Sequence, residues 1–236
     1  MPKSSLSDET VLSFFGGPVL AAFSTRFFDR AHRGDFLEAL GVDPASLVLA
    51  KQVHGVNCVK ARREGVGGFI GEADALWTDE PGIPLGVLTA DCIPVFFWNA
   101  ASQTIAIAHA GWRGLYGTII SRVVEEVFPG SRRPFQAAFG PAIRKCCYEV
   151  GPEFRDSFGP HYRSNLEPQN GGFVDLIGVA RQQLRACGVQ DDQIYDSQIC
   201  TSCRNDQFYS SRKDKSGERI LSVIMRRSAE AFHAGE

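Results

Sequence analysis

Three short motifs in the chain each supply one side chain that can bind a metal ion. His54 lies in the segment KQVHG, Cys92 in TADCIPV and His109 in AHAGWRG. Two imidazoles and one thiolate are a natural ligand set for zinc, and three protein ligands leave a fourth position open, as in catalytic zinc sites. If folding brings the three together, the chain is a metal-dependent enzyme. The alternative is that they are packing residues, which is the usual role of a buried cysteine.

Two carboxylates stand close to these motifs in the sequence. Asp74 lies in the segment EADAL, and Asp91 directly precedes Cys92. Either acid could orient a histidine ligand or act as a general base, and either could instead cap a turn. For Asp91 the orienting role is favoured.

Arg113 is the arginine best placed to bind an anion. The segment GWRG puts its guanidinium and several backbone N–H groups just before a predicted helix, an arrangement that attracts phosphate. The alternative is that Arg113 is a solvated turn residue beside a packed Trp112. Arg212, which ends the segment FYSSR, is a weaker candidate.

Four further cysteines occur in two pairs. Cys146 and Cys147 are adjacent, and adjacent cysteines rarely bind one metal together, so we expect them to pack beside a loop that could line a pocket. Cys200 and Cys203 have the spacing of a metal or redox motif, but no two further ligands stand at a matched spacing. The sequence therefore predicts no second metal site. The total of seven cysteines is odd, which favours a reducing compartment over a disulfide scaffold.

Hydrophobic patterning predicts the elements that position these motifs. Buried strands are expected at 85–89, 93–98 and 104–109, and helices at about 118–128 and 174–187. Strands so close in sequence cannot be joined by parallel crossovers, so the sheet is antiparallel or mixed. The predicted class is α+β, with mixed or antiparallel sheets layered with helices in one domain over residues 1–236.

The composition of the chain indicates which classes of partner and which cellular compartment to expect. The chain has 236 residues, of which 44% are hydrophobic, and a formal net charge of −2. This charge gives no general attraction to nucleic acid or to an anionic membrane. No apolar run reaches the roughly 20 residues that a membrane helix needs, so we expect a cytoplasmic protein. Several catalytic signatures are absent: the Walker A loop, G-x-S-x-G, H-E-x-x-H and the zinc deaminase pattern.

The motifs in this order resemble the YfiH family, also called the polyphenol oxidase or laccase-domain family. The resemblance covers about residues 23–219 and rests on KQVHG, ADALxT, TADCxPV, AHAGWRG, GPxIxxCCYEVG, and CxxC ahead of FYSxR. The chain departs from the family after Arg26, where FFDR replaces a Gly-Gly turn.

This resemblance implies that His54, Cys92 and His109 bind Zn²⁺ and that Cys92 is also the catalytic cysteine. It implies mixed sheets between helices, similar to the cytotoxic necrotizing factor cysteine hydrolases. It also implies phosphorolysis of adenosine, inosine, guanosine or methylthioadenosine, and deamination of adenosine. Some members are similar to peptidoglycan-editing factors, so an amidase or cysteine hydrolase acting on cell-wall precursors is the alternative.

The residue types test these implications. Five histidines are too few for a multicopper oxidase, which combines a His₂Cys type 1 copper with a trinuclear cluster. Zinc-activated water could attack a purine ring carbon in deamination. Phosphorolysis needs a phosphate near the ribose, and Arg113 is the first candidate to hold it, followed by Arg26 and Arg144. A nucleoside and phosphate are thus the expected partners, whereas the preferred reaction and the oligomeric state do not follow from the sequence.

Overall fold

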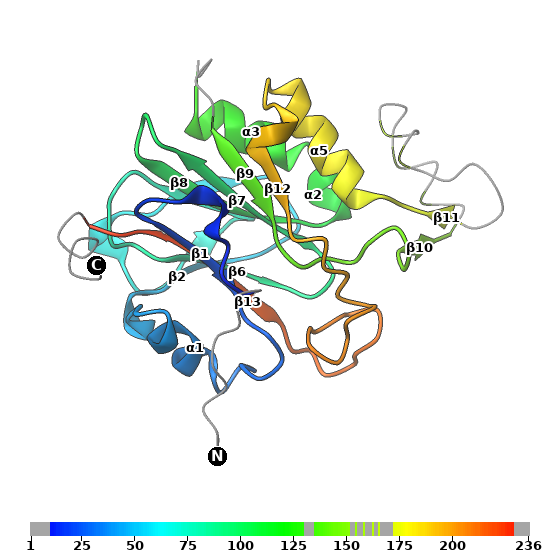
Figure 1. Cartoon of the computed structure of the whole chain (residues 1–236), viewed down its shortest axis with the longest axis horizontal. Helices are drawn as coiled ribbons and strands as arrows, with labels where there is room; N and C mark the ends of the chain where they lie inside the picture. The colour runs from blue at the N-terminus through cyan, green and yellow to red at the C-terminus, as the bar shows by residue number, and fades with distance from the viewer. Residues whose placement is uncertain are drawn as a thin grey trace.

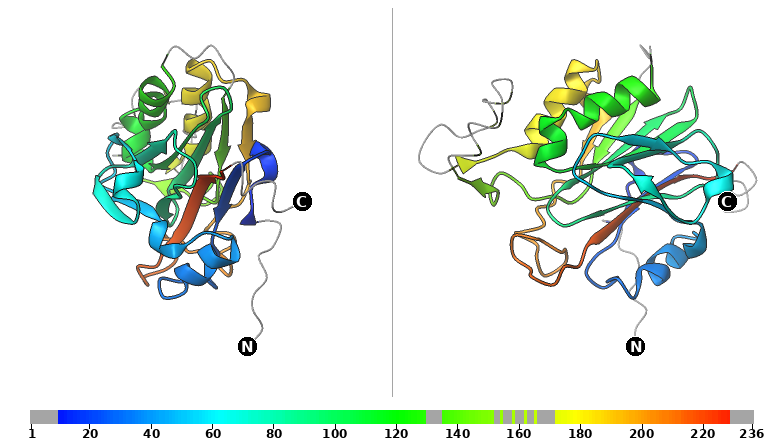
Figure 2. Two further views of the ribbon diagram at one scale, coloured as in Figure 1. Left: turned by 90° about the vertical axis from the view of Figure 1, so that its left-hand side faces the viewer. Right: turned by 180° about the vertical axis from the view of Figure 1, so that it is seen from behind.

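The fold is a stack of two mixed β-sheets with helices on both outer faces (Figure 1). The computed structural model of the chain describes residues 10–129, 135–151 and 172–228, together with residues 154, 158, 162 and 165. Figure 2 shows the layers edge-on in its left-hand view, with α3 and α5 above the sheets and α1 below them. In the described part of the chain, no helix is both long and apolar enough to cross a membrane.

The larger sheet has six strands in the order β12-β9-β7-β8-β5-β3. Its central strands pair antiparallel, whereas the outer pairs β12 with β9 and β3 with β5 are parallel. The strands span Cys58–Lys60 (β3), Ala75–Thr78 (β5), Ile93–Asn99 (β7), Thr104–Ala110 (β8), Gln136–Phe139 (β9) and Ile194–Asp196 (β12).

The smaller sheet has five strands in the order β1-β13-β6-β2-β4. Strands β1, β13 and β6 pair antiparallel, and β2 pairs parallel with both β6 and β4. These strands span Val19–Phe23 (β1), Val48–Lys51 (β2), Gly68–Glu72 (β4), Leu85–Thr89 (β6) and Ile220–Arg226 (β13). A separate two-stranded ribbon joins β10 (Glu149–Val150) to β11 (Gly172–Phe173).

Helices cover the outer faces of the two sheets. They span Arg33–Ala39 (α1), Trp112–Tyr116 (α2), Ile119–Val127 (α3) and Leu176–Ala186 (α5). Short 3₁₀ turns occur at Ser13–Phe15, Pro44–Ser46, Arg63–Gly65 and Asp191–Gln193. One face of α3 is apolar, with Ile120, Val123 and Val127 buried, so this helix packs on the larger sheet as an amphipathic helix does.

Strand β7 shows how the sequence builds this stack. All seven of its residues are buried, and successive side chains point to opposite faces of the sheet. Phe97 faces α3 and α5, whereas Phe96 and Trp98 fill the space between the two sheets. Burial of one such side chain contributes about 1.5–3 kcal/mol, so the central strands hold the layers firmly together.

The predicted α+β class with mixed sheets is confirmed, with differences in detail. The strands expected at 93–98 and 104–109 pair as a hairpin, but the strand at 85–89 belongs to the other sheet. The helix expected from residue 118 is preceded by the five-residue helix α2. Thr118 separates α2 from α3 because its backbone is left-handed, with a φ of 64°.

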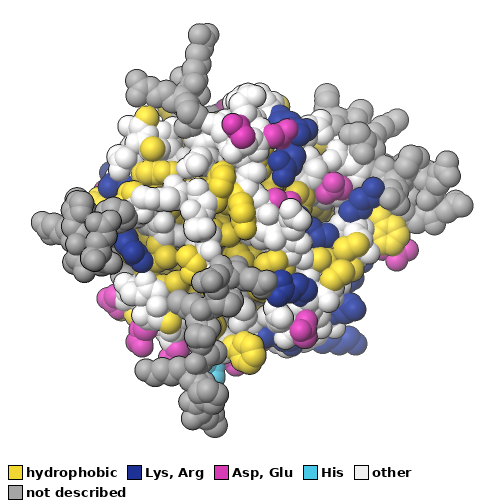
Figure 3. Space-filling model, viewed as in Figure 1, with side chains coloured by type: hydrophobic (Ala, Val, Ile, Leu, Met, Phe, Trp, Pro, Cys, Tyr) yellow, Lys and Arg dark blue, Asp and Glu magenta, His cyan; other side chains and the backbone are white. Residues whose placement is uncertain are grey.

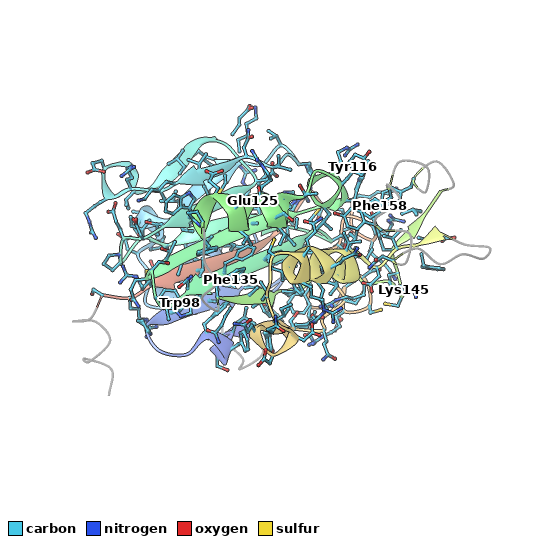
Figure 4. The ribbon with its side chains drawn as sticks, turned by 90° about the horizontal axis from the view of Figure 1, so that it is seen from above. Trp98, Tyr116, Glu125, Phe135, Lys145 and Phe158 are labelled. Atoms are coloured by element: carbon cyan, nitrogen blue, oxygen red, sulfur yellow. The ribbon has the colours of Figure 1, made fainter. Side chains whose placement is uncertain are left out.

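The ends of β7 mark two different ends of the molecule. Viewed from above, Trp98 and Phe135 lie toward one end, and Tyr116 and Lys145 lie toward the other (Figure 4). Trp98 is near the close of β7, so the beginning of this strand lies toward Tyr116 and Lys145. His54 follows β2, Cys92 directly precedes β7 and His109 is near the end of β8. These three candidate metal ligands lie close together, at the end of the molecule where β7 begins.

Candidate metal centre

His54 lies on a tight turn directly after β2. Its backbone is left-handed, with a φ of 59°. The Asp74 carboxylate accepts N–H groups from three successive residues of this turn: Val53 at 3.1 Å, His54 at 3.0 Å and Gly55 at 2.7 Å. One buried carboxylate therefore holds the backbone that carries the first candidate ligand.

The preceding residue, Gln52, fastens the same turn to the smaller sheet. Its side-chain amide donates to the Leu88 carbonyl and accepts the Leu88 N–H, each at 2.8 Å. These two hydrogen bonds resemble those between paired strands, so the Gln52 side chain continues the contact between β2 and β6 beyond the last residue of β2.

Cys92 lies on the turn that leaves the smaller sheet after β6 and enters the larger sheet at β7. Asp91, at the same turn, has a φ of 88°, outside the usual range for a residue with a side chain. Its carboxylate accepts the Thr201 hydroxyl at 2.7 Å and the Arg212 N–H at 2.8 Å, and its carbonyl accepts the Ile143 N–H at 2.9 Å. These contacts from distant segments hold the turn that aims Cys92.

His109 stands near the end of β8 and is almost completely buried. Its Nδ1 lies 2.8 Å from Asp74, and its backbone N–H donates to the Asp74 carbonyl at 2.7 Å. A carboxylate at Nδ1 holds the proton there and leaves Nε2 free to bind a metal, the pattern that many zinc-binding histidines share. Asp74 thus orients one histidine side chain and the backbone of the other, which supports its predicted orienting role.

The fold brings the three predicted ligands together. The candidate ligand atoms of His54, Cys92 and His109 all lie within 4.8 Å of one another, and the two imidazole rings are 4.7 Å apart at 80°. Gly111 makes this approach possible, because a Cβ there would lie 2.9 Å from the Cys92 sulfur and 3.2 Å from His54. We call these three residues the His-Cys-His site.

The electrostatics of the His-Cys-His site favour a charged thiolate. Burial raises the pKa of Cys92, but hydrogen bonds from His109 and His54 outweigh it and lower that pKa to about 7. Burial lowers the pKa of His109, but hydrogen bonds to Asp74 and Cys92 raise it to about 9. The protein therefore holds Cys92 ready to give up its proton to a metal or to a base.

A pocket of about 380 Å³ opens onto the His-Cys-His site. This volume lies within the range of small-molecule sites. Its wall has an apolar part, Ala50, Phe69, Leu88 and Ala90, and a polar part, Lys51, Gln52, Ser211 and Arg219, in addition to the three ligands. Lys51 and Arg219 were not predicted as site residues. Lys51 is the first residue of the KQVHG motif, but nothing in the sequence brings Arg219 to it.

The three predicted phosphate-binding arginines lie elsewhere among the described residues. Arg26 forms an ion pair with Asp214 at 3.1 Å. Arg144 forms a bidentate pair with Asp196 at 2.6 and 2.9 Å. Arg113 is exposed on the five-residue helix α2, with its guanidinium 4.5 Å from the Trp112 ring centroid.

Tyr148 connects Arg113 and Arg212 to the metal ligands. Burial and then the charge of Cys92 raise the pKa of Tyr148 to about 12, while Arg212 and Arg113 act in the opposite direction. The Arg212 guanidinium lies 5.2 Å from the Tyr148 ring centroid. Both arginines are therefore near Tyr148, and their role in phosphate binding stays a prediction. In the view of Figure 3, more of the visible Lys and Arg side chains lie on the right-hand half of the molecule than on the left.

The structure also gathers four cysteines that the sequence led us to treat as two unrelated pairs. The sulfur atoms of Cys146, Cys147, Cys200 and Cys203 all lie within 4.8 Å of one another. The expectation that Cys200 and Cys203 lack two partner ligands is therefore wrong. The parallel pairing of β9 with β12 brings the segments that follow these strands together, which the spacing in the sequence does not reveal. The signal available was the total of four cysteines in two closely spaced pairs.

Comparisons with other proteins agree with the motifs. The family described as multi-copper polyphenol oxidoreductase laccase matches residues 30–227. Purine nucleoside phosphorylase YfiH from Escherichia coli (strain K12) is 35% identical over 192 residues, which cover 80% of this chain and 77% of that protein. Adenosine deaminase RL5, from an unknown prokaryotic organism, is 35% identical over 196 residues, which cover 74% of this chain and 72% of that protein.

A solved structure shows the same architecture. The crystal structure of YlmD from Geobacillus stearothermophilus matches with a TM-score of 0.81 and 27% sequence identity. The match covers 94% of this chain and 98% of that one.

Proposed function

This chain belongs to the YfiH family of laccase-domain proteins, and we propose that it is a zinc-dependent enzyme acting on purine nucleosides. The proposed reactions are phosphorolysis of adenosine, inosine, guanosine or methylthioadenosine, and deamination of adenosine. The observation that carries the proposal is the His-Cys-His site at the base of a pocket of about 380 Å³. The names of the similar proteins supply the substrate class.

The ligand set fits one zinc ion better than a multicopper centre. Two nitrogens and one sulfur suit tetrahedral zinc, and Asp74 supports His109 as carboxylates support zinc-bound histidines. Only two groups of three or more candidate ligands occur among the described residues, and only one of them contains histidine. A trinuclear copper cluster needs several more imidazoles than this group provides.

The chain's own residues prepare the site for polar chemistry. Cys92 would bind the metal as a thiolate, and Asp74 keeps the proton on Nδ1 of His109 so that Nε2 is available as the second ligand atom. Bound zinc would supply a Lewis acid with an open position for water or a substrate oxygen. Gly111 leaves that side of the site uncrowded, because it has no Cβ to press on Cys92 and His54.

The pocket offers separate surfaces for the parts of a nucleoside and a phosphate. Phe69 is 67% exposed and lines the pocket beside Leu88 and Ala90, so a purine ring can stack against an apolar wall. Lys51 and Arg219 line the same pocket and can hold an anion. Lys51 pairs with Glu72 at 2.7 Å, but both side chains are mostly exposed, so this pair gives way to a phosphate at little cost. Arg113 remains the predicted phosphate ligand on the Tyr148 side.

A second candidate function rests on the Cys92 thiol. A cysteine with a pKa of about 7 beside a histidine is also the arrangement of a cysteine hydrolase, in which the thiolate attacks a carbonyl carbon. An amidase acting on cell-wall precursors would use this chemistry. Thorough chelation separates the two candidates, because a metal-free cysteine hydrolase keeps its activity and the zinc enzyme loses it.

Incubation of the purified protein with adenosine, with and without phosphate, tests the proposal. Phosphorolysis gives adenine and ribose 1-phosphate only when phosphate is present, whereas deamination gives inosine in either case. The Cys92→Ala variant should give neither product. If the wild-type protein forms no adenine, ribose 1-phosphate or inosine, the proposed function is wrong.

Two arginine variants locate the phosphate. Arg219→Ala should raise the KM for phosphate about tenfold or more if the anion binds in the pocket, since a charge-assisted hydrogen bond contributes about 1.5–3 kcal/mol. Arg113→Ala should do so if the anion binds on the Tyr148 side. The KM for adenosine serves as the internal control in both variants.

A further inference from the structure

Four of the six distances between the sulfur atoms of the four gathered cysteines lie between 3.4 and 3.7 Å. The Cys146 sulfur lies 3.7 Å from that of Cys147, 3.7 Å from that of Cys200 and 3.6 Å from that of Cys203. The Cys147 and Cys203 sulfurs are 3.4 Å apart, and the two remaining pairs are within 4.8 Å. Four mutually close sulfurs describe a tetrahedron.

The size of this tetrahedron matches a single metal ion. With zinc–sulfur bonds of about 2.3 Å, the edges of a regular tetrahedron of thiolates measure about 3.8 Å. We propose that Cys146, Cys147, Cys200 and Cys203 bind one structural zinc ion, separate from the His-Cys-His site. The proposal does not depend on the proposed function, because it concerns a different set of residues and no turnover. We call this set the four-cysteine site.

An iron–sulfur cluster and a disulfide fit the geometry less well, and metal analysis distinguishes zinc from a single iron ion. In an iron–sulfur cluster the four cysteines are spread over two or more iron atoms, so their sulfurs lie farther apart than around one ion. A disulfide needs one pair of sulfurs at about 2.05 Å and does not require the other two to join it. All seven cysteines are free thiols, and both members of each pair take part in the cluster.

The surroundings of Cys200 resemble those of a metal-bound thiolate. Cys200 is buried, and backbone N–H groups of Cys203 and Arg144 hydrogen-bond to its sulfur. The turn from Cys200 to Cys203 therefore stabilises negative charge on its first sulfur, which is what metal-bound thiolates need from the groups around them.

The proposed ion would clamp two segments that meet beyond β9 and β12. The backbone already links them, because the Ala142 N–H donates to the Ile199 carbonyl at 3.2 Å and the Thr201 N–H donates to the Ala142 carbonyl at 3.1 Å. The Thr201 hydroxyl also donates a hydrogen bond of 2.7 Å to the carboxylate of Asp91, the residue before Cys92. Four protein ligands leave no open coordination position, so the role of this ion is structural. It secures the contact through which Thr201 supports the Cys92 turn.

Metal analysis of full-length variants tests the proposal. Cys92→Ala removes a ligand of the His-Cys-His site and leaves the four-cysteine site intact. We expect this variant to retain about one zinc per chain, with X-ray absorption showing only sulfur neighbours at about 2.3 Å. Cys203→Ser should lose this ion, whereas Cys187→Ser, which changes a cysteine outside both sites, should keep it.

Three results would overturn the proposal. They are a folded Cys92→Ala protein without bound zinc, iron in place of zinc, or a disulfide between any two of the four cysteines in protein purified without oxidant. A lower Tm for Cys203→Ser, by roughly 5–10 °C, with an unchanged Tm for Cys187→Ser, supports the structural role.

Alkylation of the wild-type protein gives the answer even if Cys203→Ser fails to fold. Cys146 and Cys203 are exposed, so as free thiols they are accessible to iodoacetamide at a pH alkaline enough to ionise them. With zinc bound, peptide mass spectrometry should find them unmodified, and a chelator should make them reactive. Equal modification before and after chelation would overturn the proposal.

Discussion

The two candidate metal sites differ in how many ligands they have and in what surrounds them. The His-Cys-His site has three ligands that line a pocket, and Asp74 holds the His109 side chain and the His54 backbone. The four-cysteine site has four ligands, and two of them, Cys146 and Cys203, are exposed. A metal ion with an open coordination position beside a pocket can bind water or a substrate. A metal ion with four thiolate ligands has no open position, so it holds chain segments together.

The sites also differ in how the fold delivers their ligands. Cys92 and His109 stand at the ends of fully buried strands, so the core fixes their positions. The four cysteines lie on segments that follow β9 and β12, where Cys200 is buried and Cys146 and Cys203 are exposed. The Thr201–Asp91 hydrogen bond at 2.7 Å connects the two sites. The comparison predicts that damage at the first site removes activity and that damage at the second removes stability.

The largest expected effect separates activity from folding. Cys92→Ala should lower kcat/KM for adenosine by about 10³-fold or more, because a bound metal contributes several kcal/mol of transition-state stabilisation. Its Tm should stay within a few degrees of the wild type. Cys203→Ser should show the opposite pattern, with a clear loss of Tm and a smaller loss of activity. A Cys92→Ala protein that turns over at more than a tenth of the wild-type rate would contradict this division.

The next effect concerns the carboxylate that orients the ligands. Asp74→Asn removes the charge beside His109 Nδ1 and should weaken zinc binding at the His-Cys-His site about 10- to 100-fold. Competition with a chromophoric chelator measures this affinity. Asp196→Asn, which breaks the half-buried pair with Arg144, is the matched control and should leave the zinc affinity unchanged. Equal affinities in the two variants would show that Asp74 has no orienting role.

A smaller effect follows from the close approach at Gly111. Gly111→Ala would place a Cβ 2.9 Å from the Cys92 sulfur, so the thiolate must shift and zinc affinity should fall about tenfold. Gly117→Ala creates a similar clash at 2.8 Å, but with Val56 and away from the ligands. Isothermal titration of zinc into both variants separates crowding of the site from general strain. We expect Gly117→Ala to retain the wild-type affinity for zinc, and an equal loss of affinity in both variants would contradict the role of Gly111.

The smallest effect is a pH dependence near the four-cysteine site. Burial raises the pKa of Asp196, but the Arg144 guanidinium outweighs it and holds that pKa below its usual range. The pair therefore stabilises the fold above the usual carboxyl pKa of about 4, and this contribution disappears as the pH falls through the lowered value. Asp196→Asn should cost about 1–2 kcal/mol near neutral pH, and the difference from wild type should shrink in acid. Urea unfolding at several pH values measures this difference in the free energy of unfolding. A difference that stays constant as the pH falls would contradict the stabilising role of the Arg144–Asp196 pair.

The residue types made the His-Cys-His site one of two interpretations of the sequence, and the ordered motifs of the family resemblance favoured it. The antiparallel pairing of the strands at 93–98 and 104–109 then places Cys92 and His109 at the same edge of the sheet. The α+β class followed from the short connections between strands. The orienting role of Asp74 was one of several possibilities until the structure showed its hydrogen bonds to three N–H groups and an imidazole.

Other features depend on long-range pairing that the pattern does not specify. The four-cysteine site requires β12 to lie parallel to β9, and the pocket requires Arg219, just before β13, to reach the turn after β2. The division of helices α2 and α3 depends on the left-handed backbone at Thr118, a residue type that rarely adopts it. The ion pairs that engage Arg26 and Arg144 likewise join residues far apart in the sequence.

The most direct test of the central claim is the turnover of metal-stripped protein as zinc is added back. We expect no phosphate-dependent cleavage of adenosine by the stripped protein, and full recovery once zinc occupies the His-Cys-His site. Cys203→Ser should recover at about one equivalent of zinc per chain, whereas Cys92→Ala should not recover at any concentration. Full turnover by the metal-free wild-type protein would contradict the account.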